Sequence, residues 1–335
     1  MSNKKALVLL SGGLDSTIVL GLLKKQGVEV EAIHFTSLFC TCGGKEGGCG
    51  AALKAAKQLG VKLHVVKKGD DYLELIKKPA HGYGSNVNPC IDCRIYSFKK
   101  AKELMEAIGA SFIVTGEVLG QRPMSQRLEA MKVIEKEAGM EGLVVRPLSA
   151  QHLELSIPEK EGWVNRAEFL GIKGRGRKEQ MRVAAELNIT DYPCPAGGCL
   201  LTDPGFAKRV KDLLAGKKKI LPGDFMLLKY GRHFRLDERV KLVVGRNEPE
   251  NKILETLRKE SEVLLWPADV PGPHSLLLGD LAGEDIIFSA AVTARFSDVK
   301  DRTQKVKILY KAQDGVEKEI IVLSAKEEEY ITMRI

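Results

Sequence analysis

The chain has 335 residues, a formal net charge of +8, a hydrophobic fraction of 44% and a charged fraction of 29%. This composition fits ordinary globular domains and excludes a fibrous or disordered chain, and no apolar run is long enough to predict a membrane span. The excess of basic residues is compatible with a polyanionic partner but does not by itself establish one.

The start of the chain predicts no secretory signal, because Lys4 and Lys5 lead directly into a short strand-like run and then into glycines. We therefore expect a cytoplasmic protein. The seven cysteines are an odd number, which argues against a framework of structural disulfides in that compartment.

Strand and helix patterns alternate through the first part of the chain. Strands are expected at 5–10, 30–35, 61–66 and 111–115, the first and the last of them buried, and helices at 17–25, 50–59 and 96–108. Such alternation predicts an α/β fold with a parallel sheet covered on both faces. Ligands of these sheets bind at the carboxyl ends of the strands.

The first strand runs into Ser11-Gly12-Gly13-Leu14-Asp15-Ser16, directly before a helix. Two glycines allow a tight turn whose N–H groups point inward, and the helix N-terminus adds positive potential, so the loop can hold a pyrophosphate group. Ser11 and Ser16 can donate hydroxyl hydrogen bonds, and Asp15 can hold a Mg²⁺ ion that bridges phosphates. The lysine of a P-loop kinase is missing from this sequence.

Cys90 and Cys93 have the spacing of a metal, cluster or redox pair, and Cys199 follows in a second glycine-rich loop. Inert buried cysteine is the alternative. A third group, Cys40, Cys42 and Cys49, is one ligand short of a closed zinc site, which His34 or Cys194 would complete; a flap with a sulfur-relay thiol is the other reading. His64, His81 and His152 stand alone and are expected to be structural.

Residues 171–178 are rich in glycine, arginine and lysine. They are either a solvated loop before a helix or a loop that contacts phosphate. From Leu221 onward, short strands, prolines and turns predict a small α+β domain. We therefore expect a catalytic domain over 1–216 and a second domain over 217–335.

The SGGLDS loop resembles the signature of the PP-loop ATP pyrophosphatases, whose fold is of the adenine nucleotide alpha hydrolase type. Together with the cysteine loops and Thr115-Gly116-Glu117, it resembles the tRNA thiolation enzymes. The stretch Gly116 to Gln121, with Ser125 and Gln126, is most similar to the 4-thiouridine synthetases.

This resemblance implies a tRNA sulfurtransferase that adenylates a uridine carbonyl with ATP and replaces its oxygen with sulfur, 4-thiouridine being favoured over 2-thiouridine. It implies ATP and Mg²⁺ as cofactors and assigns the catalytic roles to Asp15, Cys93 and Cys199. The implied ATP site comprises Ser11, Gly12, Gly13, Asp15, Ser16, His34, Phe35 and Gly116, with adenine near His34 and Phe35. The sulfur comes from a sulfide or persulfide donor.

The extra Cys90 resembles the iron–sulfur-dependent members, so Cys90, Cys93 and Cys199 are expected to hold a 4Fe-4S cluster. A persulfide pair of Cys93 and Cys199 is the alternative, and Cys194 is a spare candidate ligand. Cys40, Cys42 and Cys49 remain candidates for zinc.

The last third of the chain resembles the NFACT RNA-binding domain, in the segments 244–251 and 265–275. Arg246 offers a guanidinium group, while Trp266 and His274 offer faces on which bases can stack. Pro273 departs from the pattern and places base contacts there in doubt. A PP-loop ligase that forms an amide on a small acid, and an RNA quality-control protein with a vestigial nucleotide domain, are the rival functions.

Overall fold

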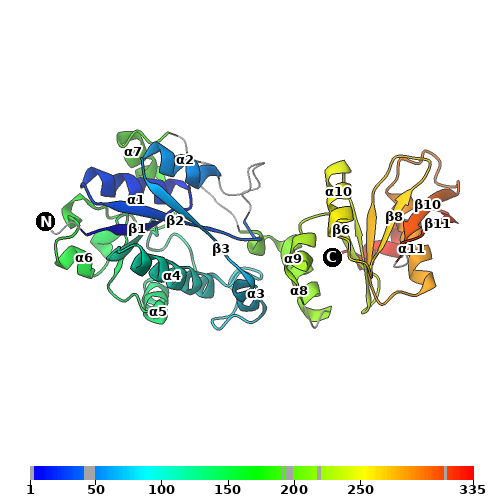
Figure 1. Cartoon of the computed structure of the whole chain (residues 1–335), viewed down its shortest axis with the longest axis horizontal. Helices are drawn as coiled ribbons and strands as arrows, with labels where there is room; N and C mark the ends of the chain where they lie inside the picture. Colours follow the sequence, from blue (N-terminus) through cyan, green and yellow to red (C-terminus); the bar gives the residue numbers. More distant parts are fainter. Residues whose placement is uncertain (1–3, 41–49, 191, 193–198, 217–219, 313–314) are drawn as a thin grey trace. The chain divides into compact units, whose positions relative to one another are not determined.

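The protein is described by a computed structural model that covers residues 4–40, 50–190, 192, 199–216, 220–312 and 315–335. The chain divides into two compact units, Met1–Thr202 and Asp203–Ile335 (Figure 1). Each unit has its own sheet and its own hydrophobic core.

The N-terminal unit is built on a sheet of five parallel strands in the order β3-β2-β1-β4-β5. The strands are β1 (Ala6–Leu9), β2 (Val30–Thr36), β3 (Lys62–Lys67), β4 (Phe112–Thr115) and β5 (Val144–Val145). The predicted α/β class is confirmed. The central strands β1 and β4 are buried along their whole length, as their unbroken apolar sequences require.

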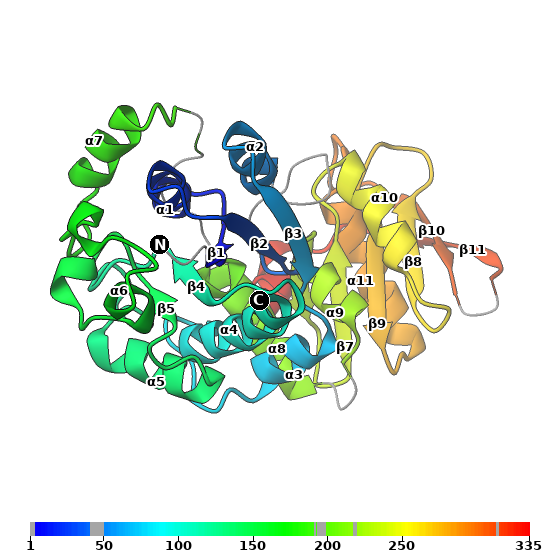
Figure 2. The same cartoon turned by 60° about the vertical axis from the view of Figure 1, so that its left-hand side comes forward.

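Helices cover both faces of this sheet, with α1 and α2 on one side and α4 and α5 on the other (Figure 2). The helices of the unit are α1 (Leu14–Lys25), α2 (Gly50–Gln58), α3 (Asp70–Lys77), α4 (Cys90–Ala107), α5 (Leu128–Ala138), α6 (Ile157–Lys160) and α7 (Lys178–Glu186). One core cluster forms under α1, α2 and α7 and a second under α4 and α5.

Two helices begin earlier than the sequence pattern suggested. Helix α1 begins at Leu14, so Asp15 and Ser16 belong to its first turn. Helix α4 begins at Cys90, after Pro89, instead of at the expected residue 96. The helical apolar spacing already runs from Ile91, and Cys90 and Cys93 therefore lie on the first turn of a helix, not in a loop.

The C-terminal unit has a six-stranded antiparallel sheet in the order β11-β10-β8-β9-β7-β6. Its strands are β6 (Arg232–Arg235), β7 (Val240–Val244), β8 (Val263–Pro267), β9 (Ser275–Gly279), β10 (Val306–Lys311) and β11 (Glu317–Val322). Its helices are α8 (Pro204–Gly216), α9 (Pro222–Leu227), α10 (Glu248–Leu257), α11 (Gly283–Arg295) and α12 (Glu327–Tyr330). Apolar clusters on both faces of the sheet give the α+β architecture that the sequence predicted.

Helix α8 belongs to the second compact unit, although the sequence placed the domain junction after it, at 216/217. The physical reason is Asp212, whose carboxylate accepts hydrogen bonds from Arg235 at 2.7 and 2.8 Å and from Lys241 at 2.8 Å. Lys241 is buried in the sheet, so this carboxylate neutralises a charge that the core would otherwise hold alone.

Among the helices that the structure describes, none has the length and apolar character needed to cross a membrane.

Close backbone contacts at two glycines fix the geometry of the loops that follow β1 and β4. A Cβ atom on Gly116, which follows β4, would lie 2.7 Å from the backbone of Asp15 and Ser16. A Cβ atom on Gly12 would lie 2.4 Å from the backbone nitrogen of Ala52. Only glycine allows the chain to pass at both points.

We predict that Gly116→Ala lowers the free energy of unfolding by about 1–3 kcal/mol, because the added methyl group meets backbone that cannot yield locally. Gly50→Ala is the matched control, since nothing lies within 4 Å of a Cβ there. Urea unfolding followed by circular dichroism measures both. Equal stability of the two variants would contradict the close approach.

Candidate functional site

The loop after β1 is ordered by its own two serine hydroxyl groups. The Ser16 hydroxyl donates to the Gly13 carbonyl at 3.0 Å and accepts from the backbone N–H of Ser11 at 3.2 Å. The hydroxyl groups of Ser11 and Ser16 lie 3.1 Å apart. Gly12 has a positive φ of 77°, which lets the loop turn within three residues before α1 begins. The result is a helix N-terminus behind a glycine turn, a site suited to anionic phosphate.

Asp15 lies on the first turn of α1 with one carboxylate oxygen engaged and the other free. Its Oδ2 accepts from the Gln121 side chain at 3.1 Å, while the buried Oδ1 has no hydrogen-bond partner. Burial raises the pKa of Asp15, and Gln121, Arg177 and Arg122 partly offset this rise. A buried oxygen without a partner fits a divalent cation, because Mg²⁺ prefers carboxylate oxygen and lowers the cost of burying the charge.

The basic stretch 171–178 lies beside this loop. Lys173 forms a parallel β-bridge with Leu119, and the N–H of Gly174 donates to the Leu119 carbonyl at 2.8 Å. These residues border a cavity of about 760 Å³, whose lining includes Lys173, Arg177 and Lys178. The positive charge of Arg177 acts on Asp15. Of the two readings of this stretch, a loop that contacts phosphate agrees better with this position.

His34 and Phe35 project from opposite faces of β2. The Nδ1 of His34 lies 2.8 Å from the Leu10 carbonyl and therefore donates to it, which leaves Nε2 as a buried acceptor without a partner. Burial lowers the pKa of His34, so the ring is neutral at physiological pH. Phe35 packs with the second core cluster, where the Lys68 ammonium group lies 5.7 Å from its ring centre. One adenine ring cannot stack on Phe35 and bond to His34 from the same side.

Cys93 is held by two donors from a neighbouring strand and helix. The Lys68 ammonium group, which follows β3, donates to its Sγ at 3.0 Å. The hydroxyl group of Tyr72, on α3, donates at 3.1 Å. Lys68 is itself placed over the rings of Tyr72 and Tyr96, at 4.3 and 5.5 Å from their centres, and this arrangement stabilises the cation by cation–π attraction.

These contacts favour the thiolate form of Cys93. Burial alone would raise the pKa of this thiol, but the charge and hydrogen bond of Lys68, the Tyr72 hydroxyl group and Arg94 together hold it below its usual range. The position of Cys93 in the first turn of α4 acts in the same direction. Burial, followed by the charge of Cys93, raises the pKa of Tyr72 far above its usual value, so Tyr72 remains a donor.

Three more cysteines lie around this thiol. Cys90 precedes it on the same helix turn, and burial followed by the Cys93 charge raises the pKa of Cys90. Burial raises the pKa of Cys199 to about 11, with smaller contributions from the charges of Cys93, Cys40 and Cys90. Cys40 and Cys199 form an antiparallel β-bridge, so a member of the third cysteine group lies next to the predicted sulfur site.

Thiolate donors of this kind suit iron and other soft metals, and the mutual charge effects place Cys90, Cys93 and Cys199 in one region. Among the residues that the structure describes, no three His, Cys, Asp or Glu side chains are already arranged around a metal position. Cys42, Cys49 and Cys194 lie outside the described residues, so the zinc reading of Cys40, Cys42 and Cys49 stays a prediction.

A chain of buried ion pairs connects the helix of Cys93 with the far edge of the sheet. Glu117 accepts from Arg94 at 2.8 Å and from Arg146 at 2.9 Å, and Arg146 also bonds to Glu135. Glu117 is fully buried, and the two guanidinium groups hold its pKa below the usual range despite the cost of burial. This pairing fixes Arg94, the residue next to Cys93.

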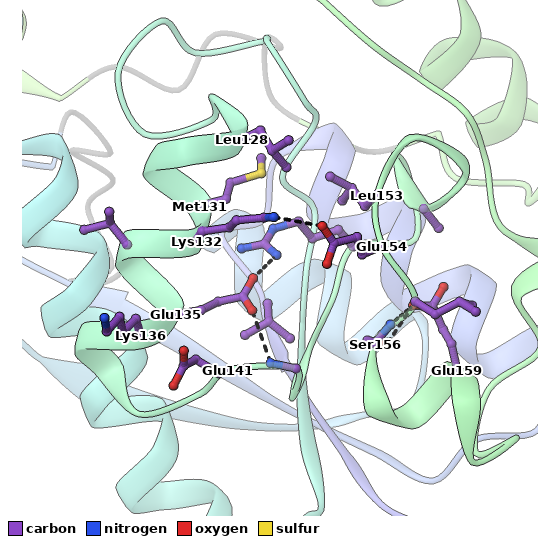
Figure 3. A pocket seen from close by; sticks show the side chains of 16 residues that line it. Leu128, Met131, Lys132, Glu135, Lys136, Glu141, Leu153, Glu154, Ser156 and Glu159 are labelled. Atoms are coloured by element: carbon purple, nitrogen blue, oxygen red, sulfur yellow. Dashed lines mark hydrogen bonds and ion pairs between the residues drawn. The ribbon is translucent and has the colours of Figure 1, made fainter.

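Arg146 and Glu135 are among the residues that line a cavity of about 400 Å³ beside β5, in which Figure 3 labels Glu135. Its rim carries the ion pair of Lys132 and Glu154, with N and O atoms 2.8 Å apart, and the apolar side chains of Leu128 and Leu153. The glycine loop and the cysteines do not line this cavity.

The three lone histidines have protein partners. His64 pairs with Glu31, the Nε2 of His152 lies 2.8 Å from the Gly171 carbonyl, and His81 lies between Asp92 and Glu137. Asp92 and Glu137 raise the pKa of His81 against the opposing effect of burial. All three histidines agree with the structural role that the sequence suggested.

In the C-terminal unit, most residues of the NFACT-like motif hold the backbone together. Asn247 caps α10, accepting from the N–H of Glu250 at 3.1 Å. Asn251 accepts from the N–H of His274 at 3.0 Å and donates to the Gly272 carbonyl at 3.3 Å. The rings of Trp266 and His274 lie 6.0 Å apart at a tilt of 43°. Base stacking on either ring stays a prediction.

Sequence reasoning missed Lys68, Tyr72 and Arg146. Arg94 directly follows the Cys90/Cys93 motif and Glu117 belongs to the motif 115–117, but the sequence assigned neither residue a role. The only available signal for Lys68 was its position directly after a strand of a parallel sheet, where ligand-binding groups gather.

The N-terminal unit is thus a parallel α/β domain with a glycine loop for phosphate and a polarised thiol at the same sheet edge. Residues 1–157 match the family model described as "Thiamine biosynthesis protein (ThiI)", and residues 231–333 match "NFACT protein RNA binding domain". The chain therefore combines a ThiI-type domain with an NFACT RNA-binding domain, as the motifs suggested.

Similar proteins carry names from tRNA thiolation. The "Probable tRNA sulfurtransferase" of Thermoanaerobacter sp. (strain X514) is 35% identical over 149 residues, which cover 44% of this chain and 37% of the relative. The "tRNA-specific 2-thiouridylase MnmA" of Sulfurimonas denitrificans (strain ATCC 33889 / DSM 1251) is 36% identical over 121 residues, 35% of each chain. The matched segments thus span little more than a third of these relatives.

Among solved structures, a 4-thiouridine synthetase in complex with RNA and ATP matches with a TM-score of 0.34 and 22% identity. The match covers 56% of this chain and 52% of that chain.

We predict that Lys68→Met raises the pKa of Cys93, because it removes the cation that favours the thiolate. Alkylation of Cys93 by iodoacetamide near neutral pH should slow by on the order of tenfold for each unit of the rise, since only the thiolate reacts. The rate is followed against pH by mass spectrometry of the Cys93 peptide. Lys67→Met, at the adjacent exposed lysine, is the control. An unchanged midpoint in Lys68→Met would contradict the assignment.

Proposed function

We propose that the chain is an ATP-dependent tRNA sulfurtransferase that exchanges a uridine carbonyl oxygen for sulfur. One observation carries this proposal: the glycine loop after β1 and the Lys68-held thiol of Cys93 lie at the carboxyl edge of the same parallel sheet. An enzyme that only forms amides from acids has no use for a thiolate at this edge. The match of residues 231–333 to an RNA-binding domain model supports RNA as the class of substrate.

In the first step, the uridine carbonyl oxygen attacks the α-phosphorus of ATP, and pyrophosphate leaves. The N–H groups of the loop and the hydroxyl groups of Ser11 and Ser16 would bind the departing phosphates. Asp15 would hold Mg²⁺ through its free Oδ1, and the bound ion supplies charge neutralisation at the phosphates. Arg177 is placed to add a second positive charge.

In the second step, a sulfur nucleophile adds to the activated uridine carbon, and AMP leaves with the former carbonyl oxygen. We assign this step to the cysteine group around Cys93. Lys68 and Tyr72 favour the thiolate form of Cys93, the form that attacks a persulfide donor or binds a metal. Cys199 is the assigned partner thiol.

The 4Fe-4S cluster stays a prediction, with Cys90, Cys93 and Cys199 as the residues that would hold it. When bound, such a cluster supplies an iron with an open coordination position for sulfide. Since the described side chains form no ready-made set of three ligands, the three cysteine side chains would have to move closer together for a cluster to bind.

We propose 4-thiouridine rather than 2-thiouridine as the product. The match of residues 1–157 to the ThiI family model and the Gly116–Gln126 segment support this choice. The named relatives include both kinds of enzyme, so the nucleoside itself must be identified.

We predict that Asp15→Asn abolishes ATP-dependent pyrophosphate release while the protein stays folded. The rate should fall by on the order of a hundredfold or more, since metal-based charge stabilisation contributes several kcal/mol. Pyrophosphate is measured in the presence of tRNA and Mg²⁺. Asp70→Asn, an exposed carboxylate on α3, should behave like the wild type. Normal pyrophosphate release by Asp15→Asn would refute the role of this carboxylate.

We predict that Cys93→Ser and Cys199→Ser yield no thiolated nucleoside, whichever route the sulfur takes. Cys90→Ser separates the routes, because only a cluster requires this thiol. With a cluster, Cys90→Ser loses both iron and 4-thiouridine after anaerobic reconstitution, and this is the expected result. A wild type that holds no iron and still thiolates tRNA from a persulfide donor would replace the cluster by the Cys93–Cys199 pair. Nucleoside analysis of digested tRNA and iron determination are the readouts.

A further inference from the structure

Arginines from four separate segments of the C-terminal unit gather around the first residues of the edge strand β6. They are Arg209 on α8, Arg232 at the start of β6, Arg246 after β7 and Arg334 near the chain end. The antiparallel register places the start of β6 beside the end of β7, with Arg232 opposite Val244. The guanidinium group of Arg232 donates to the carbonyl of Gly245, which directly follows β7, at 3.0 Å.

Arg334 enters the group from the other side of the same strand. It forms an antiparallel bridge with Phe234, and the N–H of Ile335 donates to the His233 carbonyl at 3.0 Å. Residues 232 and 234 share a face of β6, so Arg232 and Arg334 are diagonal neighbours on one side of the ladder. The guanidinium group of Arg232 also lies 4.7 Å from the ring centre of Phe296, which holds it in place.

Among the described residues, Glu250 is the acid that forms an ion pair with a member of this group. It accepts from Arg246 at 2.6 and 2.9 Å and from the N–H of Gly231 at 3.1 Å. Two close glycine contacts fix this corner, since a Cβ on Gly231 would lie 2.7 Å from Val243 and one on Gly245 would lie 2.1 Å from Asn251. The scaffold around the arginines is therefore rigid.

The remaining three guanidinium groups form no ion pair with an acid of the described residues, although Asp203 and Glu250 act on Arg209, and Glu250 on Arg232, from a greater distance. The Nε of Arg209 is buried without a hydrogen-bond partner. Burial first, and then the charge of Arg246, lowers the pKa of Arg209; burial and the charges of Arg334 and Arg246 lower that of Arg232. Like charges assembled on a rigid frame repel one another, and an anion between them removes the repulsion.

We infer that Arg209, Arg232, Arg246 and Arg334 form a binding site for the phosphate groups of RNA. Planar guanidinium forks match phosphate oxygens bidentately, and backbone contacts of this type position an RNA without reading its sequence. The match of residues 231–333 to an RNA-binding domain model favours RNA over an acidic protein. The inference rests on the proposed role of tRNA as substrate and adds the surface that holds it.

The test uses the full chain and unfractionated tRNA, with the dissociation constant measured by filter binding over a series of KCl concentrations. Arg209→Gln and Arg334→Gln should each make the slope of log K against log[KCl] less negative by about 0.7–1. The affinity near 0.1 M salt should fall by on the order of tenfold for each variant.

Two further variants control for unfolding and for a general loss of positive charge. Arg334→Lys keeps the charge and should retain most of the slope. Arg239→Gln removes an exposed arginine that pairs with Asp237 beyond the other end of β6. This variant should bind tRNA like the wild type.

Unchanged slopes in both Arg209→Gln and Arg334→Gln would overturn the site. Loss of binding to polyglutamate with intact tRNA binding would assign the arginines to an acidic protein and also overturn it. Binding is read without sulfur transfer, so a wild type that binds tRNA through these arginines but forms no thiolated nucleoside would refute the proposed reaction and leave this site standing.

Discussion

The chemistry of the N-terminal unit depends on the central place of β1 between β2 and β4 in a parallel sheet. Parallel strands end at one edge, and here Gly116, after β4, lies against the first turn of α1, while Gly12, after β1, lies against α2, so that neither residue can carry a side chain. The first of these contacts brings the loop that can hold phosphate beside Gln121, which bonds to Asp15. The sheet order thus decides which loops share the site.

The second constraint is electrostatic, and it determines the character of the cysteines. Buried thiols resist ionisation, as the raised pKa values of Cys90 and Cys199 indicate. Cys93 differs chiefly because the Lys68 ammonium group and the Tyr72 hydroxyl group reach its sulfur, with Arg94 acting in the same direction. The pKa of one thiol among several neighbours is thereby lowered, and the spacing of the cysteines in the sequence cannot predict which one.

Much of this arrangement could be predicted from the sequence, since the alternation of strands and helices and the SGGLDS loop depend on interactions between residues that are close in sequence. The start of α4 was misplaced because the Cys-x-x-Cys motif was taken as a loop, although the helical spacing already included Ile91. No sequence pattern marks Lys68, because a lysine after a strand is common. Only the fold places Lys68 next to Cys93. Of the arginines around β6, the sequence pointed only to Arg246; the others are separated from it by long stretches of sequence and come near it only in the fold.

Asp212 on α8 gives the C-terminal unit a counter-charge that its sheet lacks. With Lys241 buried and Arg235 half-buried, a polypeptide cut after α8 would leave two cations facing the same empty position. A polypeptide that begins before Pro204 keeps the helix together with the sheet whose charges it balances. The compact unit is thus longer than the segment 231–333 that matches the family model.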